Sequence, residues 1–87
     1  MDIEFDPAKD AINQAKHGVS LAEAERFEMD TALVQFDDRH DEDRWVAVGY
    51  IGPRVHVLAF TERNGLIRPI SLRLAEPREI RSYEHWS

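Results

Sequence analysis

Apolar positions near the start of the chain have the spacing of a helix. Four of them recur at i, i+3, i+4 and i+7, which predicts one buried helical face: Ala8, Ala11, Ile12 and Ala15. Asp6 can cap this helix, Pro7 suits its first turn and Gly18 can end it. A capping-box pattern at 20–23 predicts a second short helix, with an apolar side made of Leu21, Ala24 and Phe27.

From residue 32 the pattern changes to short apolar runs separated by turn residues, which is typical of strands. The predicted strands are 32–36, 45–51, 54–61 and 66–74. Gly52-Pro53 and Asn64-Gly65 favour tight turns, and Pro69 predicts that its strand lies at a sheet edge or carries a bulge. Pro77 begins a last helix. This order predicts an α+β fold with two N-terminal helices, an antiparallel sheet of three to four strands and a C-terminal helix.

The composition fits one globular domain over residues 1–87. The chain has no cysteine, which excludes a disulfide scaffold, a thiolate metal site and a thiol nucleophile. No apolar run is long enough to span a membrane and the first residues lack an export signal, so a cytoplasmic protein is expected. The net charge of −6 argues against nonspecific nucleic-acid binding. The charge is uneven, because 54–87 holds six Arg against four Glu.

Five motifs occur in the order and spacing of a known family: Phe5-Asp6-Pro7, Lys16-His17-Gly18-Val19-Ser20, Phe27-Glu28-Met29-Asp30, Thr61-Glu62-Arg63-Asn64-Gly65 and Ile70-Ser71-Leu72-Arg73. From about residue 5 to residue 83, the chain resembles the BrnT family of ribonuclease toxins of type II toxin–antitoxin modules. The resemblance implies a fold similar to RelE, cleavage of RNA without a metal ion or cofactor, and neutralisation by a BrnA-like antitoxin. It also implies a hetero-oligomer with that antitoxin, through which alone operator DNA is contacted.

Cleavage of RNA requires positive charge at the scissile phosphate, together with a general acid and a general base. Candidates for the positive charge are Arg63, Arg68 and Arg73, which we expect to gather in one shallow concavity. Alternation along the last strand places Ser71 and Arg73 on the accessible face and turns Arg68 toward the core, unless a bulge at Pro69 switches the parity. Arg73, supported by Arg63, is the predicted phosphate ligand, and the alternative is a surface salt bridge. Arg68 and Ser71 are candidate substrate contacts.

The first and last helices supply the other candidates. Lys16 and His17 stand at the helix junction, and His17 suits general acid or base chemistry because its unperturbed pKa is about 6.5. The alternative for His17 is an interaction with the last helical carbonyls. Glu79 and Tyr83 share one side of the last helix. Glu79 contacts the substrate or holds Arg73, and we favour the second role. Tyr83 is a candidate substrate contact, although core packing is the commoner role.

Two other functions stay open. Pro69, Leu72 and Glu76 depart from the family pattern, so the second hypothesis is a catalytically weak module that binds the antitoxin without cleaving RNA. A small-ligand binder has no motif behind it. The acidic loop 37–43 contains His40, but its ligands are consecutive rather than spaced for convergence, so no metal site is expected there.

Overall fold

One antiparallel sheet of four strands organises residues 1–86, which the computed structural model describes. The strands pair in chain order and are β1 (Leu33–Asp37), β2 (Arg44–Ile51), β3 (Arg54–Arg63) and β4 (Leu66–Leu74). The helices are α1 (Pro7–His17), η1 (Leu21–Arg26), η2 (Met29–Thr31) and α2 (Pro77–Trp86). The α+β class, the four-stranded antiparallel sheet and the C-terminal helix are confirmed, whereas the second N-terminal helix is a 3-10 helix.

Helix α1 begins and ends where the sequence predicts. Asp6 caps it by accepting a hydrogen bond from the Ala8 N–H at 2.8 Å, and Gly18 ends it with a φ of 72°. The predicted buried face is wrong, because all four of its residues are exposed: Ala8, Ala11, Ile12 and Ala15. Ile12 has 66% of its surface in contact with solvent. Helix α1 is therefore held in place by something other than apolar packing along this face.

Asn13, the buried residue of α1, provides that attachment. Its amide donates to the carbonyl oxygens of Val19 and Leu72, both at 2.8 Å. Its side-chain oxygen accepts the N–H of Leu72 at 3.0 Å. Because β4 is an edge strand, these bonds satisfy backbone groups that no neighbouring strand reaches. A polar side chain thus joins α1 to the sheet.

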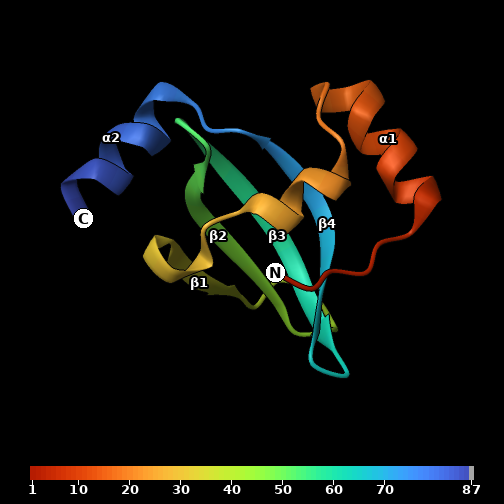
Figure 1. Cartoon of the computed structure of the whole chain (residues 1–87). Coiled ribbons are helices and arrows are strands. Elements are labelled where there is room, and N and C mark those ends of the chain that lie inside the picture. The colour runs from red at the N-terminus through yellow and green to blue at the C-terminus, as the bar shows by residue number, and fades with distance from the viewer. Residues whose placement is uncertain (87) are drawn as a thin grey trace.

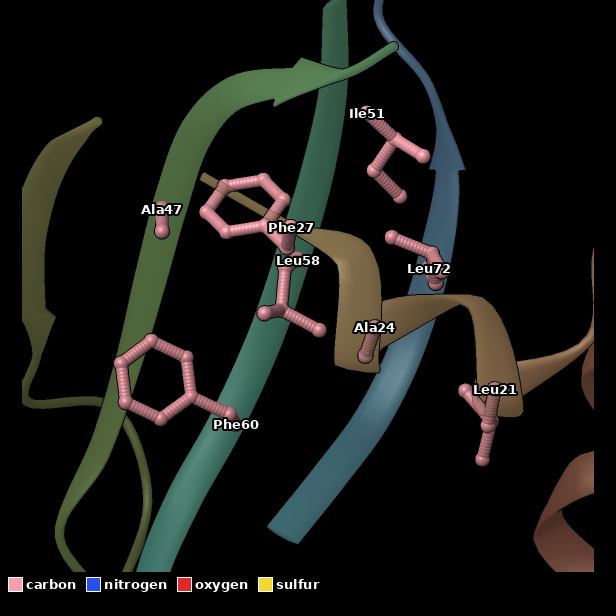
Figure 2. Close-up of a cluster of buried hydrophobic side chains, with 8 residues drawn as sticks. All are labelled: Leu21, Ala24, Phe27, Ala47, Ile51, Leu58, Phe60 and Leu72. Atoms are coloured by element: carbon pink, nitrogen blue, oxygen red, sulfur yellow. The ribbon is translucent and has the colours of Figure 1, made fainter. Parts of the chain in front are cut away.

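The hydrophobic core lies between η1 and one face of the sheet, as Figure 2 shows. Its buried members are Leu21, Ala24, Phe27, Ala47, Ile51, Leu58, Phe60 and Leu72. The predicted apolar side of the second helix is therefore confirmed. Gly49 of β2 allows Phe27 and Ala32 to lie close to the sheet, because a Cβ at position 49 would lie 3.0 Å from both Ala32 Cβ and Phe27 Cζ. Real Cβ contacts are essentially never closer than that distance.

Strand β4 carries a bulge beside Pro69. The pairing register shifts between two opposed pairs, Ala59 with Ser71 and Phe60 with Pro69. Ile70 is therefore an extra residue in an edge strand, so the edge position and the bulge predicted from Pro69 are both present. The extra residue reverses the alternation of side chains, which buries Pro69 and Leu72 on the core side. Arg68 consequently lies on the opposite face, and its predicted orientation toward the core is wrong.

The two faces of the sheet are covered unequally. Figure 1 shows η1 and η2 passing across one face, with α1 beyond β4 and α2 on the side away from α1. We call the face that η1 and η2 cross the covered face. Among the helices in residues 1–86, only α2 packs against the other face, at one end of it, and we call this face the open face. None of the helices in residues 1–86 is long and apolar enough to cross a membrane.

Candidate active site on the open face of the sheet

A cavity of about 420 Å³ lies between the open face and α2. Its floor consists of apolar side chains from the centre of the sheet: Val46, Val48, Val57 and Ala59. Its polar groups come from four other elements: Ser71 and Arg73 of β4, Glu79 of α2, Gln35 of β1 and Arg39 of the loop after β1. An apolar floor with a few converging polar groups is the usual form of a ligand site. We call it the Arg73 cavity.

Arg73 is fixed in this cavity by two parallel hydrogen bonds to Glu79. Its Nη1 donates to Oε1 at 2.8 Å and its Nη2 donates to Oε2 at 2.9 Å. Glu79 Oε1 also accepts the backbone N–H of Glu76 at 2.8 Å, so the carboxylate caps the start of α2 as well. The hydrogen bonds and charge of Arg73 lower the pKa of Glu79, and Glu79 raises the pKa of Arg73. Both groups are therefore charged at neutral pH.

Pairing with Glu79 leaves part of the guanidinium available. A guanidinium has five N–H donors, and Nη1 also donates to the Leu74 carbonyl at 3.3 Å. Among the described residues, no acceptor is bonded to Arg73 Nε–H or to the second Nη2–H. Two donors on a rigid group can therefore bind an anion in the cavity, although the adjacent carboxylate offsets much of the positive charge.

The other two arginines of the later half lie on the same face but outside the cavity. Arg68 is directly opposite Thr61, whose side of β3 is the side that lines the Arg73 cavity. Arg63 is two residues farther along β3 and shares this face. The pairing registers place Arg68 two side-chain rows from Arg73, or about 13 Å along β4. One cavity does not collect all three guanidinium groups, but one face of the sheet presents them all.

Lys16 and His17 lie in a second, smaller cavity across the edge of β4. It has a volume of about 240 Å³ between α1 and β4, and we call it the α1 groove. Ser71 lines both the α1 groove and the Arg73 cavity. Within residues 1–86, neither the Lys16 side chain nor the His17 side chain forms a hydrogen bond or ion pair, so the predicted alternative of a His side chain bound to helical carbonyls is not what the structure has. The two cavities thus meet at the bulge.

Comparisons with known proteins identify the family. The family described as "Ribonuclease toxin, BrnT, of type II toxin-antitoxin system" matches residues 5–79, which include both Arg73 and Glu79. The chain belongs to the BrnT family. The crystal structure of the Brucella abortus ribonuclease toxin BrnT is similar to it, with a TM-score of 0.67 and 28% identity. That match covers 87% of this chain and 97% of the other. No curated protein sequence matches the chain.

Membership of this family indicates the general function of the chain. BrnT proteins are ribonuclease toxins of type II toxin–antitoxin systems, and a toxin of this type has an antitoxin partner. In this BrnT chain, Tyr83 lies at the wall of the Arg73 cavity but is 97% buried. Its hydroxyl donates to the Thr31 carbonyl at 2.6 Å, and its ring packs edge-on against Tyr50. Tyr83 therefore holds α2 on the sheet and presents only a small part of its ring to the cavity.

Two arginines of this BrnT chain were not among the predicted site residues. Arg39 lines the Arg73 cavity and forms two 2.8 Å hydrogen bonds with Asp37, whose pKa falls well below its usual range as a result. Arg44 shares the open face, because it pairs with Asp37 and is in register with Thr61 and Arg68. Its Nε is buried with no partner among the described residues. The signal was available, since Arg44 precedes Val46 and Val48 at a spacing of two.

Proposed function

We propose that this chain is an endoribonuclease toxin with a RelE-like fold that cleaves RNA without a metal ion. The proposal rests on Arg73, which Glu79 holds rigidly in an open cavity with two donors unused. In this reaction the RNA 2′-oxygen attacks the adjacent phosphorus and the bond to the 5′-oxygen breaks. Negative charge accumulates on the phosphorane oxygens, where positioned cationic donors are most effective. Arg73 supplies the positive charge that stabilises these oxygens.

The remaining candidates act along one path over the sheet edge. RNA that passes Ser71 reaches both the Arg73 cavity and the α1 groove, where His17 serves as general acid or base and Lys16 adds positive charge. Arg68 and Arg63 bind phosphates farther along the open face. Glu79 positions Arg73, and the Tyr83 ring closes the cavity wall. No step in this scheme requires a metal ion.

The proposal also covers the binding partner of the chain and its cellular compartment. A BrnA-like antitoxin binds this single-domain toxin in the cytoplasm, forms a hetero-oligomer with it and alone contacts operator DNA. The chain's net charge of −6 repels nucleic acid at long range, which is compatible with a toxin that binds RNA only through short-range arginine contacts. That charge also disfavours direct DNA binding by the toxin itself.

Cleavage of end-labelled RNA in EDTA tests the enzymatic proposal. The wild-type chain should cut RNA, and a strand with 2′-deoxy sugars should stay intact because the attacking oxygen is missing. Arg73→Ala should lower the rate by about 10²–10³. Arg26→Ala is the matched control, since Arg26 also pairs with a glutamate, at 2.7 Å, but its side chain is exposed and lies on η1, outside the cavity. Equal rates for the two variants, or cleavage abolished by EDTA, would contradict the proposal.

The second candidate is an interaction module that binds the antitoxin without cleaving RNA. It is favoured by the bidentate Glu79 pair, which neutralises Arg73 in the cavity. Expression of the chain alone in bacteria separates the two functions. Growth arrest that Arg73→Ala relieves supports the enzyme, whereas no arrest from a well-folded, well-expressed wild-type chain supports the module.

A further inference from the structure

Strand β1 leaves apolar side chains uncovered on the side of the sheet that elsewhere forms the core. Val34 is 41% exposed and Phe36 is 56% exposed. The Phe36 ring packs edge-on against Trp45 at 5.6 Å, and Trp45 stacks on Phe60 at 6.0 Å. A groove of about 260 Å³ follows these residues and is lined by Met29, Val34, Trp45, Phe60 and Glu62. This β1 groove is thus an extension of the core that is open to solvent.

The two edge strands of the sheet, β1 and β4, differ in how far their outer backbone groups are hydrogen-bonded. Backbone bonds from the N-terminal segment protect β4: Glu4 N–H donates to the Ile67 carbonyl at 2.9 Å, and Ile67 N–H donates to the Asp2 carbonyl at 3.3 Å. Asn13 covers the same edge at Leu72. No element within residues 1–86 pairs with the outer side of β1. An exposed strand edge with apolar side chains is a template for an added strand.

The charges around the β1 groove are negative. Glu62 lies in the groove itself, and Glu28 and Asp30 line a neighbouring cavity that shares Met29 with it. None of these three carboxylates forms an ion pair with another described residue. The acidic loop follows β1 directly. A second copy of this chain would bring like charges together, so charge complementarity selects a cationic occupant.

We propose that the outer edge of β1 binds an extended segment of a partner polypeptide. Its central residues are apolar at alternate positions and cover Val34 and Phe36, and its ends carry Lys or Arg that pair with the surrounding carboxylates. The identity of the partner rests on the proposed function, since in a toxin–antitoxin module it is the antitoxin. On the open face, the added strand lies beside Leu33 and Gln35, which border the Arg73 cavity. Partner binding therefore narrows the entrance for RNA.

Synthetic peptides test the site without relying on RNA cleavage. The probe is a blocked peptide with the sequence Lys-Arg-Val-Thr-Val-Thr-Val-Arg-Lys, and the control probe replaces each Lys and Arg by Glu and Asp. The chain carries Trp86→Phe, so that Trp45 is its sole tryptophan. Titration of Trp45 fluorescence should give saturable binding of the basic peptide with a Kd below about 1 mM, at least about tenfold tighter than the acidic peptide.

Two variants place the binding at β1. Val34→Lys adds a repelling charge that an edge strand tolerates, and Phe36→Ser removes the largest exposed ring; each should weaken the basic peptide about tenfold. Ile12→Ser is the matched control, because Ile12 is also an exposed apolar residue and should leave binding unchanged. Circular dichroism verifies that each variant is folded. No saturation by about 1 mM, equal binding of both peptides, or no effect of either variant would overturn the inference.

Co-purification tests the identity of the partner. The chain is co-expressed with its cognate antitoxin, and Val34→Lys and Phe36→Ser should lose that complex while Arg73→Ala retains it. An antitoxin that stays bound to both β1 variants would overturn its assignment to this edge. If Arg73→Ala and wild type both fail to cut RNA while β1 binding persists, the enzymatic proposal fails and this inference stands.

Discussion

Replacement of Asn13 by alanine should be among the most destabilising single changes in α1. Asn13 is 4% exposed, and its amide makes three hydrogen bonds to the backbone of Val19 and Leu72. Asn13→Ala leaves these three backbone groups without partners. At about 1 kcal/mol for each lost bond, the free energy of unfolding should fall by about 3 kcal/mol. A chain of this length is stable by roughly 4–13 kcal/mol, so the loss is a large fraction of the total.

Urea denaturation and thermal unfolding measure this loss. For a domain of this size, a change of about 3 kcal/mol should lower Tm by about 12–24 °C. Gln14→Ala is the matched control, because the exposed Gln14 side chain donates one hydrogen bond to the Asp10 carboxylate and should contribute less than about 0.5 kcal/mol. Asn13→Asp should be worse than Asn13→Ala at pH 7, since a carboxylate there faces two carbonyl oxygens, and the difference should shrink in acid. Similar stabilities for Asn13→Ala and Gln14→Ala would refute this account of how α1 is held.

Two further predictions concern packing and charge. Gly49→Ala should destabilise the fold by about 1–3 kcal/mol in urea, because its Cβ would press on Phe27 and Ala32; an unchanged midpoint would contradict this. Arg73 lowers the pKa of Glu79 below 4.5, so the folded state binds fewer protons than the unfolded state just below that pH. The stabilisation from this pair should be complete above pH 4.5 and be lost as the pH falls through the folded-state pKa. Glu79→Gln should flatten that part of the stability profile, and an unchanged slope would exclude the pair as its source.

Local signals in the sequence were sufficient for most element boundaries. Asp6 and Gly18 mark the ends of α1 because capping depends only on neighbouring backbone. Asn64 and Gly65 both have positive φ, as a tight hairpin turn requires, so the Asn-Gly pair predicted that turn. The buried face of α1 could not be predicted in this way. Its partner is the backbone of Leu72, 59 residues away, and no helical periodicity reports that contact.

The candidate site was predictable in part. Arg73 could be found because its strand and the last helix were correctly placed, which puts Glu79 within reach. The face on which Arg68 lies depended on whether a bulge was present. A proline in a strand does not by itself show on which side of Pro69 the extra residue falls. Arg44 was not chosen as a site residue because the acidic loop 37–43 directly before it suggested a solvated segment rather than the start of β2.

Because β4 contains an extra residue, the number of residues between Arg68 and Arg73 determines which face of the sheet each side chain occupies. Arg68 and Arg73 are five positions apart, and an odd separation in a regular strand sends two side chains to opposite sides. Ile70 changes the count, so both guanidinium groups reach the same side. Loss of the Ile70 codon would remove the bulge and leave the arginines four positions apart, an even separation that keeps both on one side of a regular strand. Related chains that keep both arginines on one face are therefore expected to have either five positions and a bulge or four positions and a regular strand, whereas five positions without a bulge would separate them.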